Sequence, residues 1–166
     1  MNAMEQHQEQ WYANVGRFAI AMGEIEWAAV QMLQWLPNAK FSPKDGLYPL
    51  IDSLSKAIEG GTSDFERGIA ICVNEASQLR PSRNSILHSA VRWQVAFEGY
   101  PEDAEIEVGP DFDVESLVPR FVSYVHDKKD PTARMSLGDL EGHVASARAL
   151  SDRMWHIIIA EHARRT

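Results

Sequence analysis

The first part of the chain carries apolar residues at alternating steps of four and three. They are Trp11, Val15, Phe18, Met22, Ile25, Ala29, Met32 and Leu36. This spacing puts them on one face of an α-helix, so a helix is predicted over about residues 5–36, ended by Pro37. At 100° per residue, Glu26 lies at the edge of the buried face. Ile20 and Trp27 point outward, which predicts an exposed apolar pair that needs a cover.

The same periodicity predicts four further helices. They cover about residues 47–59, 62–80, 82–89 and 137–164. Gly60 and Gly61 are expected to close the first of these. Pro81 lacks the backbone N–H that a helix interior uses, so it is expected to end the next one, and Ser82 then caps a short helix that begins at Arg83.

Residues 91–136 follow a different pattern. Val91, Trp93, Val95 and Phe97 alternate with other residues, and this period of two is typical of a β-strand. A second segment rich in β-formers, at 121–125, can pair with it, and 133–136 is a candidate third strand. We therefore expect a β insert here, either a hairpin or three-stranded.

An acidic stretch separates the two stronger strand candidates. Residues 98–118 contain eight Asp or Glu residues and no Lys or Arg, and Pro101 and Pro110 favour a loop. Its ordinary interpretation is a solvated surface excursion. The functional interpretation is a docking surface for a basic protein partner, or an array of negative charge that repels nucleic acid from one side.

Composition limits the class of protein. With 166 residues, 45% hydrophobic and 24% charged, the chain is long enough for one domain with a real core, and we take residues 1–166 as that domain. The net charge of −8 argues against sequence-independent coating of nucleic acid, although a small basic site remains compatible with it. The single cysteine, Cys72, and the lack of a signal-like N-terminus or a membrane-length apolar run make the cytoplasm the expected location.

The segment from Arg83 to His88 carries the clearest candidate chemistry. Arginine offers a planar fork of donors that suits a phosphate, and histidine takes or gives a proton near neutral pH. Cleavage of RNA through its own 2′-hydroxyl needs those two groups and neither a metal nor a cofactor. Asn84 precedes His88 by four residues, so on a helix it can orient the imidazole. Arg83 and His88 are about 140° apart round a helix, so either the arginine curls back or a second chain completes the pair.

A second pair, Arg120 and His126, satisfies the same loose spacing. It lies on a predicted strand rather than a helix and has no neighbouring amide like Asn84, so we treat it as accidental. The histidines show no metal-ligand spacing and Cys72 has no partner cysteine, so no metal site is predicted.

The motif Arg-Asn-x-x-x-His (Arg83, Asn84, His88) after an apolar helical segment resembles the hallmark of HEPN domains. The long first helix with Ile25-Glu26 and the closing amphipathic helix resemble that family too. The resemblance implies an antiparallel helical bundle that dimerises with its motif helices at the interface. It also implies catalytic roles for Arg83 and His88, with Asn84 and Glu26 in support. Many such domains are metal-independent ribonucleases of toxin–antitoxin or phage-defence systems, while others bind nucleotides or are inactive.

The sequence therefore predicts a homodimeric endoribonuclease that leaves 2′,3′-cyclic phosphate ends. Two alternatives stay open. The domain is a catalytically silent interaction module that uses the acidic residues 98–118, or it is a nucleotide-binding module in which Arg83 reads a phosphate.

Overall fold

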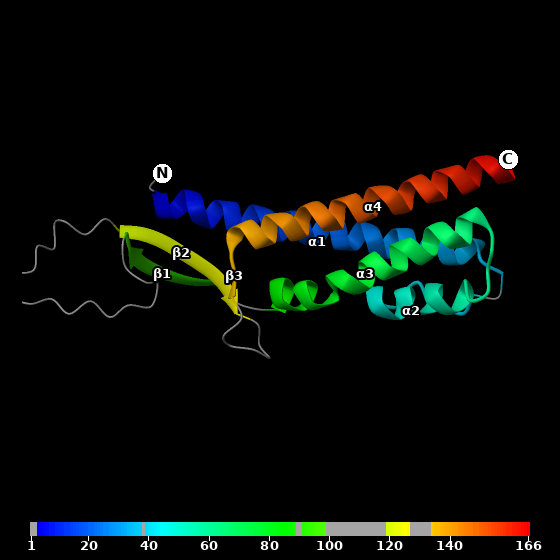
Figure 1. The fold of residues 1–166 in the computed structure, drawn as a ribbon, viewed down its shortest axis with the longest axis horizontal. Coiled ribbons are helices and arrows are strands. Elements are labelled where there is room, and N and C mark those ends of the chain that lie inside the picture. The colour runs from blue at the N-terminus through cyan, green and yellow to red at the C-terminus, as the bar shows by residue number, and fades with distance from the viewer. Residues whose placement is uncertain (1–2, 38, 89–90, 99–118, 127–133) are drawn as a thin grey trace, which may run out of the picture.

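Four helices pack together in the part of the chain that the structure describes (Figure 1). The computed structural model describes residues 3–37, 39–88, 91–98, 119–126 and 134–166. The helices are α1 (Ala3–Trp35), α2 (Leu47–Ala57), α3 (Asp64–His88) and α4 (Leu137–Arg165). The prediction of a mainly α protein built as a helical bundle is confirmed.

Helix α1 buries the face that the sequence predicted. Seven of the eight apolar residues that define this face are buried, and the eighth, Val15, is half-buried against the same core. Ile20 and Trp27 are 65% and 57% exposed, so the prediction that they point outward is also confirmed. The helix is amphipathic, but it carries this second, uncovered apolar patch on its outer side.

A glycine and a pair of capping residues set the end of α2 and the start of α3. Gly60 has a φ of 77°, a left-handed conformation that costs glycine little and so closes the turn after α2. Ser63 and Glu66 then form a capping pair. The Ser63 hydroxyl accepts from the Glu66 N–H at 3.2 Å, and the Glu66 carboxylate accepts from the Ser63 N–H at 2.9 Å.

Helix α3 runs through Pro81 without a break, and the predicted division into helices 62–80 and 82–89 is wrong. Proline in a helix interior removes one hydrogen bond, here to the Ser77 carbonyl, and crowds the preceding turn. The Ser77 hydroxyl also bonds back to the Val73 carbonyl at 2.8 Å. The helix continues because buried residues on both sides of Pro81, Leu79 and Ile86, hold it against the core. Tertiary packing thus overrides the local preference.

Helix α4 begins where the sequence predicted a helix, and a capping box between Ser136 and Asp139 fixes its start. It lies antiparallel to α3. Arg153 pairs with Glu75 at 3.0 Å, while Ile157, one turn further along α4, packs against Gly68, which is earlier in α3. It is parallel to α1, however, because the contacts between them advance in the same direction along both helices. The expectation of a wholly antiparallel bundle is wrong for this pair. The reason is that α3 reverses the chain direction and α4 reverses it again.

Three contacts mark the parallel packing of α1 and α4. Glu141 accepts from Asn14 at 3.4 Å, Glu24 accepts from Ser151 at 3.1 Å, and Arg165 donates to the Trp35 carbonyl at 3.2 Å. The last of these satisfies a carbonyl that the end of α1 leaves unpaired.

An ion-pair cluster strengthens the end of this helix pair. Glu161 is buried, and its carboxylate pairs with Arg164 at 2.9 Å and with Arg165 at 2.8 Å. The Arg165 guanidinium also lies over the Trp35 ring, and the His162 ring stacks on the same indole. The C-terminal ends of α1 and α4 are therefore fixed to each other.

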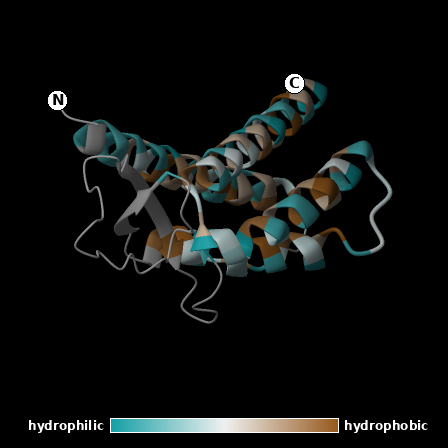
Figure 2. Cartoon of the chain, turned by 60° about the vertical axis from the view of Figure 1, so that its left-hand side comes forward, coloured by the Kyte–Doolittle hydropathy of each residue, from teal (hydrophilic) through white to brown (hydrophobic). Residues whose placement is uncertain are grey.

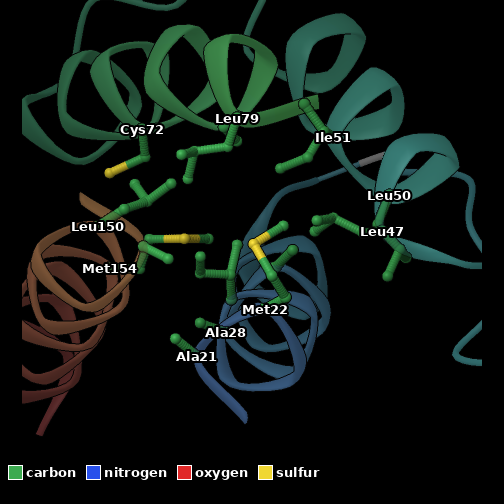
Figure 3. Close-up of a cluster of buried hydrophobic side chains, with 14 of the residues drawn as sticks. Ala21, Met22, Ala28, Leu47, Leu50, Ile51, Cys72, Leu79, Leu150 and Met154 are labelled. Carbon is green, nitrogen blue, oxygen red and sulfur yellow. The ribbon is translucent and has the colours of Figure 1, made fainter. Parts of the chain in front are cut away.

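The core draws on all four helices. Figure 2 shows hydrophobic and hydrophilic residues alternating along the helices, as one-sided burial requires. In Figure 3, Met22 from α1, Ile51 from α2, Leu79 from α3 and Met154 from α4 reach into one common space. Cys72 is buried in the same core, and this burial raises the pKa of its thiol to about 11.

The chain between α3 and α4 includes three strands: β1 (Val91–Phe97), β2 (Pro119–His126) and β3 (Arg134–Met135). They pair antiparallel in the order β1-β2-β3. Val125 of β2 is buried against the helical core, and Met135 packs beside it. This segment thus follows the end of α3 and leads into α4. None of the helices in the described ranges is long and apolar enough to cross a membrane.

Candidate functional site

The predicted catalytic segment occupies the C-terminal end of α3. Arg83 is half-buried, Asn84 is exposed, and His88 is the last residue of the helix. Because α3 is regular over this stretch, the backbones of Arg83 and His88 are about 7.5 Å apart along the helix axis. The His88 side chain lies outside the described residues, so the predicted pairing of Asn84 with His88 stays a prediction.

The structure brings Arg83 to an aromatic ring that the sequence did not single out. Tyr48, in the first turn of α2, lies beside the end of α3, and the Arg83 guanidinium lies over its ring at 5.5 Å from the centroid. The Arg80 guanidinium lies over the same ring at 4.7 Å. Cation–π contact of this kind holds a guanidinium in place without neutralising it. Tyr48, Arg80 and Arg83 therefore form a positively charged cluster, which we call the Tyr48 cluster.

The Tyr48 hydroxyl has an unusual environment. Its oxygen is buried, although the residue as a whole is only half-buried, and it has no hydrogen-bond partner among the described residues. Burial raises the pKa of the Tyr48 hydroxyl above its ordinary value of 10.0, while the charges on Arg83 and Arg80 act in the opposite direction. The hydroxyl is thus a protonated donor that lacks an acceptor.

The sequence analysis missed two residues of this cluster, Arg80 and Tyr48, and the break predicted at Pro81 is the reason only for Arg80. With α3 continuous, Arg80 and Arg83 are one turn apart and share a face. That spacing was visible in the sequence. Tyr48 had no such signal, since only the packing of α2 on α3 brings it to the two arginines.

Glu26 does not join this site through Arg83. It is half-buried on α1, as expected for the edge of the buried face, but no ion pair links it to Arg83 within the described part of the chain. Its supporting role stays a prediction.

The second arginine–histidine pair lies on β2, where Arg120 pairs across the sheet with Ala96 and His126 with Arg134. The side chains of Arg120 and His126 lie outside the described residues. So does the acidic stretch 98–118 apart from Glu98, which is exposed. The prediction of a partner-binding surface there remains untested.

A groove of about 400 Å³ lies between α3 and α4, away from the Tyr48 cluster. It is lined by Glu75, Gln78, Leu79, His143, Ser146, Ala149, Leu150 and Arg153. Its charged groups are already matched, since Arg153 pairs with Glu75, and Ser146 bonds to the Gly142 carbonyl at 3.0 Å. An anion therefore finds less uncompensated charge here than at the Tyr48 cluster.

Across the described ranges, no group of three or more His, Cys, Asp or Glu side chains is placed to hold a metal ion. Comparisons of the chain with protein-family models, with curated proteins and with solved structures give no match. The Tyr48 cluster therefore has to be interpreted from its own chemistry: two arginine forks lie over one ring, whose hydroxyl is buried without an acceptor among the described residues.

Proposed function

We propose that this protein is a metal-independent endoribonuclease of the HEPN type, a helical bundle in which residues 91–136 form the β insert. The observation that carries the proposal is the state of Arg83. Arg83 is half-buried, and its guanidinium is held on the Tyr48 ring and has no carboxylate partner among the described side chains. An oriented and unneutralised arginine is the group that stabilises charge on a phosphate in the transition state.

The reaction uses the RNA strand as its own nucleophile. The 2′-oxygen attacks the neighbouring phosphorus as it loses its proton, and the bond from phosphorus to the 5′-oxygen breaks. That leaving oxygen takes up a proton, so the products carry a 2′,3′-cyclic phosphate and a 5′-hydroxyl. His88 performs one of the two proton transfers and water the other, while Arg83 neutralises the charge on the phosphorane. Asn84 orients His88.

The test is cleavage of a labelled RNA in the presence of EDTA. Arg83→Ala and His88→Ala should each lower the rate by about 100-fold or more. Arg67→Ala is the matched control, because Arg67 is an exposed arginine of the same helix that pairs with Asp64 and lies far from Tyr48 along α3. Cleavage that persists in His88→Ala, or that requires a divalent metal, rejects the mechanism.

The enzyme acts as a homodimer through the outer face of α1. That face consists of Tyr12, Gly16, Ile20, Gly23 and Trp27, in which large and small side chains alternate. A side chain added at either glycine would meet nothing within 4 Å among the described residues. Two copies crossing antiparallel can therefore seat Ile20 of each chain in the hollow at Gly16 of the other, which buries the apolar pair twice.

This contact does not join the two candidate active sites. The outer face of α1 points away from the core, whereas α2 and α3 pack on the buried side. Arg83 and His88 accordingly work within one chain, and the dimer serves to cover Ile20 and Trp27.

Light scattering during gel filtration tests the dimer. Ile20→Glu should give a monomer, whereas Ile71→Glu, at another exposed isoleucine on α3, should leave the dimer intact. A wild-type chain that is strictly monomeric at micromolar concentration disproves the contact.

A further inference from the structure

The Tyr48 cluster concentrates positive charge on an otherwise acidic protein. Two guanidinium groups lie over one ring, at 4.7 and 5.5 Å from its centroid, and the net charge of the whole chain is −8. Like charges one helical turn apart destabilise a helix. The contacts with the Tyr48 ring offset part of this repulsion, and an anion that joins the two arginines would relieve the rest.

Several arginines of the helices have a carboxylate partner, whereas Arg80 and Arg83 have none among the described residues; Arg17 and Arg148 have none either, but Arg80 and Arg83 share one aromatic ring. Arg67 pairs with Asp64, Arg153 with Glu75, and Arg165 with Glu161. Within the described part of the chain, no carboxylate pairs with Arg80 or Arg83. These two side chains therefore keep their donors for a ligand that approaches from solvent, to which Arg80 is exposed.

The hydroxyl of the same tyrosine is a further donor, and because its oxygen is buried it meets an anion only if the surrounding side chains move. A buried hydroxyl without an acceptor is costly, and an anion drawn in by the two arginines would provide one. The three donors come from two helices, α2 and α3, so the site exists only in the folded protein.

We propose that Tyr48 and Arg80 bind a terminal phosphate, the monoester group at the 5′ end of an RNA strand, and that Arg83 lies between this group and the scissile phosphate and contacts both. Two guanidinium groups balance the double negative charge of a monoester, whereas an internal phosphodiester carries only one. The guanidinium forks hold the phosphate oxygens and the Tyr48 hydroxyl donates to one of them. The inference deepens the proposed function, on which it rests for the choice of RNA as the ligand.

Recognition of the strand end has a consequence for cleavage. Arg80 lies about 12 Å along α3 from His88. A 5′-phosphate fixed near Arg80 thus determines which bond of the strand reaches His88, and the enzyme should cut 5′-phosphorylated RNA close to that end.

The experiment measures binding separately from cleavage. Fluorescence anisotropy is recorded for a short RNA with a 3′ label, prepared with either a 5′-phosphate or a 5′-hydroxyl, and the protein carries His88→Ala so that the RNA stays intact. The 5′-phosphate should strengthen binding by about tenfold or more. Tyr48→Phe and Arg80→Gln should each remove most of that preference, while Arg67→Gln should retain it. Circular dichroism shows whether each variant is folded.

Equal affinity for RNA with a 5′-phosphate and RNA with a 5′-hydroxyl overturns the inference. So does a loss of the 5′-phosphate preference in Arg67→Gln as large as in Arg80→Gln, because it would indicate attraction by overall charge alone. Adenosine monophosphate is the second probe. If it binds as tightly as the RNA and loses affinity equally in Tyr48→Phe, the site does bind a terminal phosphate, but the ligand is a free nucleotide rather than an RNA end.

The two proposals fail in different ways. If the wild-type protein cleaves no RNA but prefers the 5′-phosphate through Tyr48, the ribonuclease proposal falls and the phosphate site stands. If cleavage depends on His88 but ignores the 5′ end, the phosphate site falls and the ribonuclease proposal stands.

Discussion

Replacing Tyr48 with phenylalanine removes a single oxygen atom, and we expect this change to stabilise the free protein. The oxygen is buried without a hydrogen-bond partner among the described residues, whereas the ring and its contacts with Arg80 and Arg83 remain in the variant. An unsatisfied buried polar group costs about 1–3 kcal/mol. Tyr48 is only half-buried, so the low end applies, and we expect a gain of about 1 kcal/mol.

Urea unfolding in phosphate-free buffer measures this gain. The midpoint should rise with an unchanged slope, and the Tm should rise by about 2–4 °C for a chain of this length. Tyr12→Phe is the matched control, since Tyr12 is 64% exposed and its hydroxyl is solvated. A Tyr48→Phe protein that is less stable than wild type would refute the reasoning, because it would mean that the hydroxyl already has a partner.

The pH dependence of the same pair of proteins provides a second check. The folded protein raises the pKa of Tyr48 above 10.0, so folding favours the protonated hydroxyl. That contribution is complete below pH 10 and is lost as the pH rises through the raised value. Wild type should therefore lose stability relative to Tyr48→Phe above pH 10. If the difference in stability between the two proteins stays the same above pH 10, the raised pKa of Tyr48 is contradicted.

Other predictions concern the helices and the core. Pro81→Ala should stabilise the protein by about 1–3 kcal/mol in urea unfolding, because it restores a hydrogen bond inside α3; no change would mean that the helix ends there. Ser136→Ala should cost about 1 kcal/mol, and it should also flatten the loss of stability in acid. Hydrogen bonds from Ser136 lower the pKa of Asp139 below 3.8, so their contribution is present above that value and disappears as the pH falls through the lowered one. Cys72 should react with a thiol reagent only after unfolding, and rapid reaction of the native protein would show that the core opens.

The helices could be predicted because each of them buries one face. The spacing of the apolar residues on α1 specifies which side of the helix meets the core, and the same argument identified Ile20 and Trp27 as exposed. The start of α4 near residue 137 was also predicted, and the capping box at Ser136 that fixes it involves only neighbours in the chain. Helix direction was not predictable in this way. The parallel packing of α4 on α1 depends on contacts such as that between Arg165 and Trp35, which are far apart in the sequence.

The candidate site was only half predictable for the same reason. Arg83 was found through its motif, and Arg80 would have followed from a continuous α3. The sequence rule for proline is local, and it failed at Pro81 because buried residues on both sides hold the helix together. Tyr48 could not be found at all, because its role depends on α2 lying against α3. The pairing of Asn84 with His88 stays a prediction.

Three features that weaken the fold occur together at the end of α3. Pro81 interrupts the hydrogen bonding of the helix, Arg80 and Arg83 place like charges one turn apart, and the Tyr48 hydroxyl is buried without an acceptor. Departures from local rules concentrate where a protein binds or reacts, because function requires groups that folding alone would not select. If that explains the clustering, Tyr48→Phe should gain stability and lose phosphate binding together, since the hydroxyl serves only the ligand. Pro81→Ala should gain stability while keeping its phosphate affinity, because it changes the helix backbone and removes no donor. Phosphate binding that survives Tyr48→Phe would mean that the three features share a place in the fold but no function.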